Sequence, residues 1–384
     1  MIPYGKQDIT QADIDAVMEA LTSDLITQGA RVPEFEATIA KYCDAEYAVA
    51  VNSATSALHI ACLALGVTEK DIVWTSPNSF VASANCALYC GAEVDFVDID
   101  STTGNMCIQT LSNKLEQAAK HNRLPKVIIP VHFAGQSCDM AAISGLAKQY
   151  NIAIIEDASH AIGGRYQNTK IGSCKYSDIT VFSFHPVKIV TTAEGGMALT
   201  NKPELHQKLM LLRSHGVTRD ESIMAASNPA PWVYEQVTLG FNYRMTELQA
   251  ALGLSQISRI DEYVTRRNHI AARYMTAFNQ ADIDCLTVSE DCYSAYHLFV
   301  IKVPQHCHEL IFKQLRQAGI GVNLHYIPIH TQPYFTRLGF TTGMFPNAET
   351  HAAQAISLPL YPKLTTEQQD IVIKEVINAV QTCN

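Results

Sequence analysis

Two apolar runs that end in polar residues decide the fold of this chain: Ile154-Ile-Glu-Asp157-Ala-Ser-His160 and Val181-Phe-Ser183-Phe-His-Pro-Val-Lys188. Each run begins with β-branched or aromatic residues, which favour a strand, and then turns polar. Open parallel sheets bind their ligands outside the carboxyl ends of the strands. We therefore expect Asp157, Ser183 and Lys188 to approach one another at one edge of a sheet.

Similar runs alternate with helical segments through the first half of the chain. The strand-like runs are Tyr47–Val51, Asp71–Thr75, Glu93–Asp98, Val127–Phe133, Ile152–Glu156 and Thr180–Phe184, with one more beginning at Gly195-Gly196. The helical segments between them are Ala54–Leu65, Phe80–Cys90, Thr110–Ala119 and Met140–Tyr150. This rhythm predicts an α/β fold with a mostly parallel central sheet covered on both faces.

The pattern changes after Thr246. Apolar residues at helical spacing predict one long helix over Thr246–Phe278. Strands are then expected over Tyr296–Val303 and Val322–Ile329, among helices over Glu309–Ala318 and Thr366–Val380. We predict a large domain over residues 1–255 and a smaller α+β domain over residues 256–384, packed as one unit because no flexible linker separates them.

Composition excludes several classes of protein. The chain has 384 residues, 47% of them hydrophobic, so a disordered chain is excluded, and its net charge of −9 disfavours a nucleic-acid partner. Eleven cysteines are too sparse for a disulfide scaffold. The first residues lack a secretory apolar region, and no apolar run approaches the ~18 residues that span a bilayer. We expect a reduced, cytoplasmic protein with no membrane partner.

Familiar nucleotide and metal motifs are missing from the sequence. Neither G-x-G-x-x-G nor G-x-x-x-x-G-K-[ST] occurs. Cys86 and Cys90 form one closely spaced pair, and His306-Cys307-His308 another candidate group, but no second set follows at zinc-site spacing. We expect these cysteines to be small core residues, the histidines to lie in a loop, and no metal to be bound.

Asp157, Ser183 and Lys188 together form the set of groups that pyridoxal 5′-phosphate (PLP) requires. A lysine forms a Schiff base with PLP, a carboxylate holds a proton on its pyridine nitrogen, and hydroxyl or N–H donors bind its phosphate. Taken singly, each residue has an ordinary alternative: a turn aspartate, a small strand residue, a surface lysine. The combination favours PLP.

A second anion-binding element precedes this set. Asn52-Ser-Ala-Thr-Ser56 joins a strand to a helix, so its N–H groups and hydroxyls point at one spot. Phe80 follows the turn Ser76–Ser79 and is able to stack on a flat ring, although an ordinary core phenylalanine is an equal alternative from local sequence.

Five stretches resemble the DegT/DnrJ/EryC1/StrS sugar aminotransferases: Asn52–Leu58, Glu156–His160, Ser183–Lys188, Glu194–Gly196 and Phe241–Glu247. The likeness extends nearly end to end and implies fold type I, the architecture of aspartate aminotransferase, with PLP as cofactor. One branch of that family has histidine in place of the lysine and dehydrates its sugar. Lys188 is present here, which favours transamination.

The resemblance implies a role for each matched residue. Lys188 forms the Schiff base and carries the proton, Asp157 pairs with the pyridinium nitrogen, and His160 lies at the ring hydroxyl. The residues implied in binding the ring or the phosphate are Phe80, Ala54, Thr55, Ser183 and, from the neighbouring subunit of a homodimer, Asn242. The positions implied in contacting the nucleotide sugar are Tyr4, Thr27, His325 and Tyr326.

Five stretches resemble one branch in particular, which acts in pseudaminic acid synthesis: Leu25–Gly29, Asn52–Leu58, Asp157–Ala161, Thr191–Gly196 and Leu212–Gly216. That resemblance implies transfer of the amino group of L-glutamate to carbon 4 of a UDP-linked 4-keto-6-deoxy-N-acetylhexosamine. The alternatives are an aminotransferase for another nucleotide-linked keto sugar, such as a bacillosamine, perosamine or 4-amino-arabinose precursor, and a type I lyase or aldolase on free amino acids. A cofactor-binding protein without catalysis is a further alternative.

Overall fold

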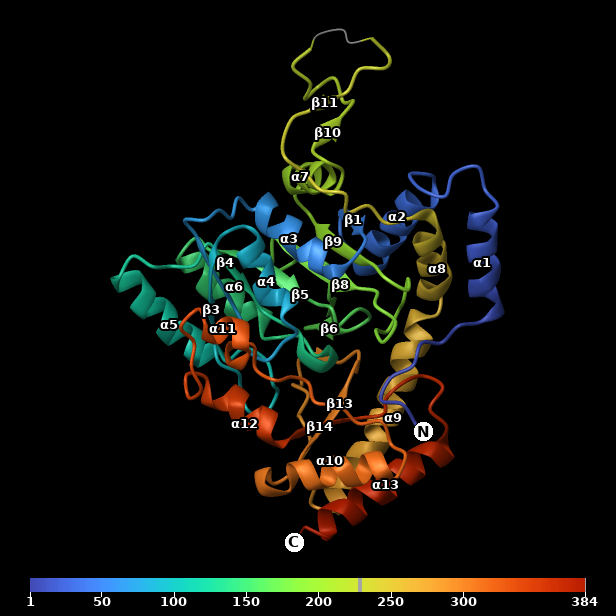
Figure 1. Ribbon diagram of the computed structural model, residues 1–384, viewed down its shortest axis with the longest axis vertical. Coiled ribbons are helices and arrows are strands. Elements are labelled where there is room, and N and C mark those ends of the chain that lie inside the picture. Colours follow the sequence, from blue (N-terminus) through green and yellow to red (C-terminus); the bar gives the residue numbers. More distant parts are fainter. Residues whose placement is uncertain (227–229, 384) are drawn as a thin grey trace.

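A seven-stranded sheet forms the centre of the computed structural model, which describes residues 1–226 and 230–383 (Figure 1). In spatial order its strands are β1 (Tyr47–Val51), β9 (Gly196–Thr200), β8 (Ile179–Ser183), β5 (Ala153–Asp157), β4 (Val127–Ile129), β2 (Ile72–Thr75) and β3 (Glu93–Phe96). All pairs from β8 to β3 are parallel, whereas β9 runs antiparallel to both neighbours. The predicted α/β fold with a mostly parallel sheet is confirmed.

Helices cover both faces of the sheet. The helices on one face are α3 (Ala54–Ala64), α4 (Ala82–Tyr89) and α7 (Pro203–Arg213), and those on the other are α5 (Ile108–Lys120) and α6 (Met140–Gln149). Successive strand residues point to opposite faces, so Ile155 joins the first apolar cluster and Ile154 the second. Burial on both faces explains why these strands read as continuous apolar runs.

The functional residues meet at one edge of this sheet. Asp157 is the last residue of β5, and Ser183 is the last residue of the neighbouring strand β8. Because β5 and β8 are parallel, their carboxyl ends lie side by side. Strand β1 ends near the same edge and leads through Ser53 into helix α3.

The long helix expected over Thr246–Phe278 is instead two helices, α8 (Glu247–Ile257) and α9 (Ile260–Gln280). A capping box of Thr246 and Gln249 begins α8 as the sequence requires. The break falls at Arg259, whose φ of −109° and ψ of 8° leave helical geometry. Its guanidinium pairs at 2.8 Å with the buried carboxylate of Asp13 in α1 (Gln11–Leu21), a contact that a continuous helix pattern does not reveal.

The C-terminal part has its own apolar cluster. It lies among α9, α10 (His308–Gln317), α13 (Thr366–Gln381) and the antiparallel pair β13 (Phe299–Lys302) and β14 (Ala355–Leu358), at the lower end of Figure 1. Further elements around the core are α2 (Arg31–Cys43), α11 (Pro333–Thr336), α12 (Pro346–Gln354), β6 (Arg165–Tyr166), β7 (Thr169–Lys170) and β12 (Cys292–Tyr293). A domain division after residue 255 stays a prediction.

The strand expected over Val322–Ile329 is wrong. Only Asn323 makes a β-bridge, to Ser357 of β14. Beyond it the backbone bonds side chains instead of a neighbouring strand: the Tyr326 N–H donates to Asn78 Oδ1, and the His325 carbonyl pairs with His351 Nε2. The segment therefore folds over the sheet edge as a loop that carries His325 and Tyr326 to the site.

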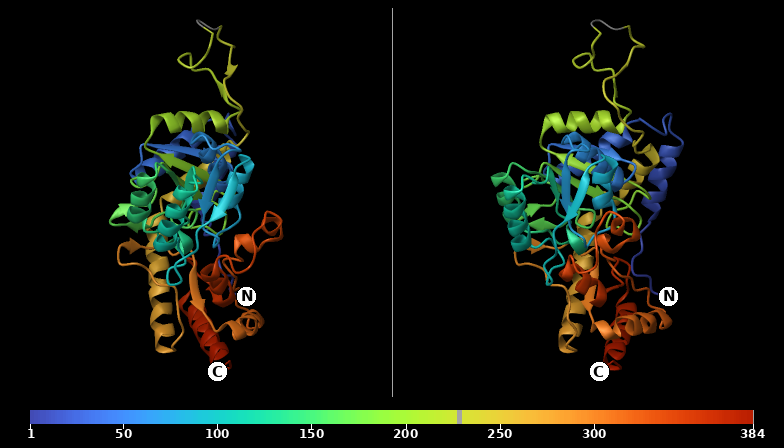
Figure 2. Two further views of the ribbon diagram at one scale, coloured as in Figure 1. Left: turned by 90° about the vertical axis from the view of Figure 1, so that its left-hand side faces the viewer. Right: turned by 60° about the vertical axis from the view of Figure 1, so that its left-hand side comes forward.

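A narrow hairpin of β10 (Val217–Thr218) and β11 (Glu235–Gln236) projects from the body of the molecule (Figure 2). Large apolar side chains on and near it are exposed, including Trp232 at 77% and Leu239 at 76%. Along the described residues, no helix is long and apolar enough to cross a membrane.

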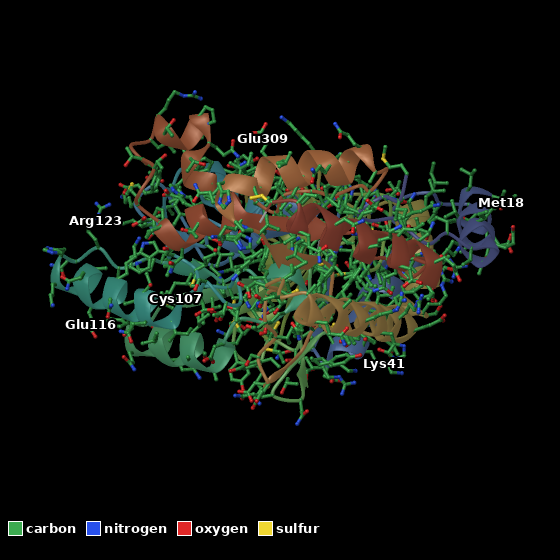
Figure 3. The ribbon with its side chains drawn as sticks, turned by 90° about the horizontal axis from the view of Figure 1, so that it is seen from below. Met18, Lys41, Cys107, Glu116, Arg123 and Glu309 are labelled. Atoms are coloured by element: carbon green, nitrogen blue, oxygen red, sulfur yellow. A yellow bond between two sulfur atoms is a disulfide. The ribbon has the colours of Figure 1, made fainter. Side chains whose placement is uncertain are left out.

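One pair of cysteines departs from the expectation of reduced core residues. Cys307 and Cys383 form a disulfide, visible near Glu309 in the view from below (Figure 3). Helix α13 packs along α10 and so brings the end of the chain to the start of that helix, with the two Cα atoms 6.2 Å apart. The sequence did not reveal this contact, because 76 positions separate the two residues.

Candidate active site

A cavity of about 410 Å³ opens at the carboxyl edge of the sheet. Ten of the twelve predicted site residues line it: Tyr4, Ala54, Thr55, Phe80, Asp157, His160, Ser183, Lys188, His325 and Tyr326. They come from the N-terminal segment, the ends of strands β5 and β8, the start of helix α3, the loops that follow β2, β5 and β8, and the C-terminal loop. The two that do not line the cavity are Thr27 and Asn242.

Asp157 is held as a fixed hydrogen-bond acceptor. The Ser83 hydroxyl donates to Oδ2 at 2.6 Å, and the Ser159 hydroxyl and N–H donate to Oδ1 at 2.6 and 3.2 Å. Ser79 lies 2.7 Å from Ser83 and extends the chain of hydroxyls. These donors fix the orientation of the buried carboxylate, as a partner for a cationic ring nitrogen requires.

Glu156, the residue before Asp157, helps to hold the end of strand β5 in place. Its Oε2 lies 2.7 Å from Nε2 of His132, and both side chains are buried. Despite burial, hydrogen bonds and the charge of Glu156 raise the pKa of His132 to about 10, so the pair is ionic. The His132 N–H also donates to the Asp157 carbonyl at 3.0 Å. This ion pair fixes the end of β5 from the side opposite the cavity residues.

Lys188 is the cation of the cavity. Burial lowers its pKa to about 8, and the negative charge of Asp157 opposes that shift. An amine with this pKa is neutral in a large share of molecules near pH 8, which a nucleophilic lysine needs. The alternative of a surface lysine is wrong, because Lys188 lines the cavity.

The start of α3 supplies anion donors. Ser53 caps the helix by accepting from the Ser56 N–H, so the N–H groups of Ala54 and Thr55 remain without an intrahelical partner. Gly196 allows this helix end to sit against β9, because a Cβ there would lie 2.5 Å from the Ala54 nitrogen. Ser183 lines the same cavity and faces Gly196 across the β8–β9 pair. The arrangement is an anion site of the helix N-terminus type.

Neutral aromatic groups form the opposite side of the cavity. Nε2 of His160 lies 3.1 Å from the Tyr326 hydroxyl, and the His160 ring packs 4.4 Å from that of His297. Burial and the charge of Lys188 lower the pKa of His160, of His297 and of His325, the last to about 3. Three imidazoles in one cavity are therefore uncharged near neutral pH.

Phe80 and Tyr4 lie toward the cavity opening. Phe80 is 60% exposed, so the alternative of an ordinary core phenylalanine is wrong. Tyr4 packs 5.5 Å from the ring of His325. Both rings are placed to contact a ligand that enters the cavity.

Neither Thr27 nor Asn242 lines the cavity. Thr27 makes a β-bridge to Thr246, and Asn242 makes one to Ser214. Both side chains are exposed. Their predicted roles in the site stay predictions.

The sequence analysis missed three cavity residues that contact predicted site residues. Ser83 and Ser159 orient Asp157, and His297 packs on His160. Ser79 precedes helix α4 and Ser83 lies in its first turn. His297 precedes a strand of the C-terminal part and carries no sequence signal.

The residues present fit PLP. The cavity supplies a carboxylate acceptor, a lysine of lowered pKa and a helix start for a phosphate. Nδ1 of His160 is buried and has no hydrogen-bond partner among the described residues, so it is available to a polar atom of a ligand. Asp157, Lys188, His160, Ser183, Ala54 and Thr55 are the residues placed to hold it.

A model of the DegT/DnrJ/EryC1/StrS aminotransferase family matches residues 7–377. The chain belongs to this family. It is therefore a PLP-dependent nucleotide-sugar aminotransferase with the type I fold.

Named relatives and solved structures agree with this assignment. The chain is 38% identical to the spore coat polysaccharide biosynthesis protein SpsC of Bacillus subtilis, over 99% of this chain and 97% of that protein. It is 37% identical to the UDP-4-amino-4,6-dideoxy-N-acetyl-beta-L-altrosamine transaminase of Campylobacter jejuni, over 97% and 96%.

Two solved structures superpose over nearly the whole chain. PseC of Helicobacter pylori, an aminotransferase involved in the biosynthesis of pseudoaminic acid, matches with a TM-score of 0.90 at 32% identity, over 99% of both chains. The PLP form of a sugar aminotransferase, Spr1654 from Streptococcus pneumoniae, matches with a TM-score of 0.90 at 31% identity, over 100% of this chain and 99% of that one.

Proposed function

We propose that this aminotransferase moves the amino group of L-glutamate to carbon 4 of a UDP-linked 4-keto-6-deoxy-N-acetylhexosamine. The product would be UDP-4-amino-4,6-dideoxy-N-acetyl-β-L-altrosamine, a step of pseudaminic acid synthesis. The observation that carries the proposal is the single cavity that joins Lys188 and Asp157 to His325 and Tyr326. The likeness to the Campylobacter and Helicobacter enzymes supports the choice of sugar.

PLP, when bound, supplies an aldehyde that carries the amino group and a ring that accepts the electrons released at the substrate carbon. The chain's own residues provide the rest. Asp157, which accepts three hydrogen bonds, would pair with the ring nitrogen and favour its cationic form. The start of α3 and Ser183 would hold the phosphate of PLP.

Lys188 moves the protons. Its lowered pKa lets the ε-amine take a proton from the α-carbon of glutamate and, in the second half of the cycle, deliver one to carbon 4 of the sugar. The face from which Lys188 delivers that proton sets the configuration of carbon 4. The neutral imidazoles and the Tyr326 hydroxyl offer hydrogen bonds to sugar hydroxyls without adding charge.

We also propose that the active unit is a homodimer. Thr27 and Asn242 are exposed and lie outside their own chain's cavity, so they would serve the partner's site. The projecting hairpin with exposed Trp232 and Leu239 offers apolar surface for that association.

A second nucleotide sugar is the alternative substrate, and the likeness to SpsC at 38% identity is the observation that favours it. The deciding experiment incubates the enzyme and glutamate with a panel of UDP-, GDP- and dTDP-linked 4-keto-6-deoxy sugars. NMR then identifies each amino-sugar product. Exclusive use of a GDP- or dTDP-sugar would overturn the substrate and keep the class. Turnover of free amino acids that UDP does not inhibit would favour a lyase.

A further inference from the structure

Three side chains that commonly bind metals gather in the C-terminal part of the molecule. They are His306, Cys307 and Cys383, and one ligand atom of each lies within 4.8 Å of the other two. None of the three lines the catalytic cavity. Among residues 1–226 and 230–383, no other group of three or more histidine, cysteine, aspartate or glutamate side chains converges in this way.

The fold assembles this group from two distant places in the sequence. The run His306-Cys307-His308 has no second set of ligands nearby in the chain, but helix α13 packs along α10 and brings Cys383 to it across 76 positions. His308 is engaged elsewhere, because its Nε2 pairs with the Ala355 carbonyl at 2.9 Å. The group therefore has two sulfurs and one imidazole.

The surroundings of the group favour a bound cation. Cys307 is buried, Cys383 is half-buried and His306 is exposed, so an ion reaches the sulfurs from the side of the imidazole. Cys307 is also the N-cap residue of α10, where the positive end of the helix dipole stabilises a thiolate. Two thiolates and an imidazole, with water in the fourth position, form a coordination set that zinc accepts.

In the structure the two sulfurs are joined as a disulfide, and a metal requires them to be apart. Zinc–sulfur bonds of about 2.3 Å at a tetrahedral angle place two sulfurs about 3.8 Å from each other. The Cα atoms of Cys307 and Cys383 are 6.2 Å apart. At this separation, rotation about the Cα–Cβ bonds of the two cysteines moves the sulfurs between the two spacings while the helices stay in place.

We propose that His306, Cys307 and Cys383 bind Zn²⁺ when the disulfide is reduced, with water as the fourth ligand. In the reduction a dithiol attacks the disulfide, the S–S bond breaks, and two protein thiols and the disulfide of the reductant form. Zn²⁺ then replaces the two thiol protons, which pass to the solvent. The disulfide and the metal exclude each other, and each connects the end of α13 to the start of α10.

The first test titrates the PLP-loaded enzyme with Co²⁺, after a phosphine has reduced the disulfide and has been removed without air. Tetrahedral Co²⁺ with thiolate ligands absorbs red light, which PLP does not absorb, and added Zn²⁺ displaces it. We expect one such Co²⁺ per chain in the reduced enzyme and none in the oxidised enzyme. No red absorbance in the reduced enzyme, or equal absorbance in both forms, would overturn the proposal.

Variants distinguish the three ligands from other cysteines and histidines. Cys383→Ser should weaken Zn²⁺ binding at least about 100-fold, and His306→Gln about tenfold, because the first removes a thiolate and the second a neutral ligand. One control is Cys107→Ser, at the N-cap of α5, which lies apart from the disulfide in Figure 3. The other is His269→Gln, at an exposed position of α9. Both controls should bind Zn²⁺ as wild type does, and binding that survives Cys383→Ser would contradict the assignment.

The melting temperature of the holoenzyme tests the connection between α13 and α10. Reduction of wild type should lower the melting temperature by several degrees, because it frees the end of α13, and saturating Zn²⁺ should restore most of the loss. Cys383→Ser should respond to neither treatment. A reduced wild-type enzyme whose melting temperature Zn²⁺ does not raise would refute the connection through the metal.

Discussion

The two sides of the catalytic cavity are built in different ways. The sheet side carries Asp157 at a strand end and Lys188 just beyond the next, and it holds the charges of the site. The C-terminal side carries His297, His325 and Tyr326 on segments outside the helices and strands, and its imidazoles are neutral. We infer that amino transfer depends on the sheet side and that sugar recognition depends on the C-terminal side.

The largest expected effect tests the sheet side. Lys188→Ala should lower turnover by at least about 10³-fold, because it removes both the nucleophile and the proton carrier. The assay is formation of 2-oxoglutarate from glutamate in the presence of the keto sugar. In wild type, borohydride should fix PLP covalently on residue 188, as peptide mass spectrometry would detect. Undiminished turnover of the variant would refute the role of Lys188.

The second-largest loss of activity is expected when the carboxylate of Asp157 is replaced. Asp157→Asn should retain PLP binding but lower kcat by about 10²- to 10³-fold, since an amide does not hold a cationic ring nitrogen. The orienting neighbour serves as the graded control: Ser83→Ala removes one hydrogen bond to Asp157 and should cost only about tenfold. A larger loss in Ser83→Ala than in Asp157→Asn would reverse the assigned order.

The C-terminal side should respond differently. Tyr326→Phe removes the hydroxyl that bonds His160, and we expect KM for the nucleotide sugar to rise by roughly tenfold while KM for glutamate stays unchanged. Steady-state kinetics with each substrate varied in turn measures this. Equal changes in both KM values would show that sugar recognition does not depend on the C-terminal side in particular.

The smallest expected effect is a shift in the pH dependence of PLP loading. The neutral amine of Lys188 is the form that condenses with PLP, so the loading rate of apoenzyme should rise with pH and level off above about 8. The charge of Asp157 raises the pKa of Lys188, so Asp157→Asn should move that midpoint to lower pH. Stopped-flow absorbance of PLP loading reports the midpoint, and a shift to higher pH would contradict the electrostatics.

The sheet side was predictable because its signals are local. Apolar runs that end in Asp157 and Ser183 indicated neighbouring strand ends, and the Asn52–Ser56 turn indicated a helix start that binds an anion. The parallel topology then fixes their proximity, since parallel strands present their carboxyl ends at one edge.

The sequence did not predict the structure of the C-terminal side, and the reason is physical. The Val322–Ile329 segment reads as a strand, but its backbone bonds the side chains of Asn78 and His351, which lie far from it in sequence. The break at Arg259 and the Cys307–Cys383 disulfide likewise depend on long-range partners. Local propensity carries no signal for such contacts.

The most direct measurement separates the two half-reactions in single-turnover experiments on wild type, Lys188→Ala and His325→Gln. One experiment follows the absorbance change when glutamate meets the PLP form, and the other follows the return when the keto sugar meets the aminated form. We predict that Lys188→Ala loses both halves, whereas His325→Gln slows only the sugar half. A His325→Gln enzyme slowed equally in both halves would contradict the division between the two sides of the cavity.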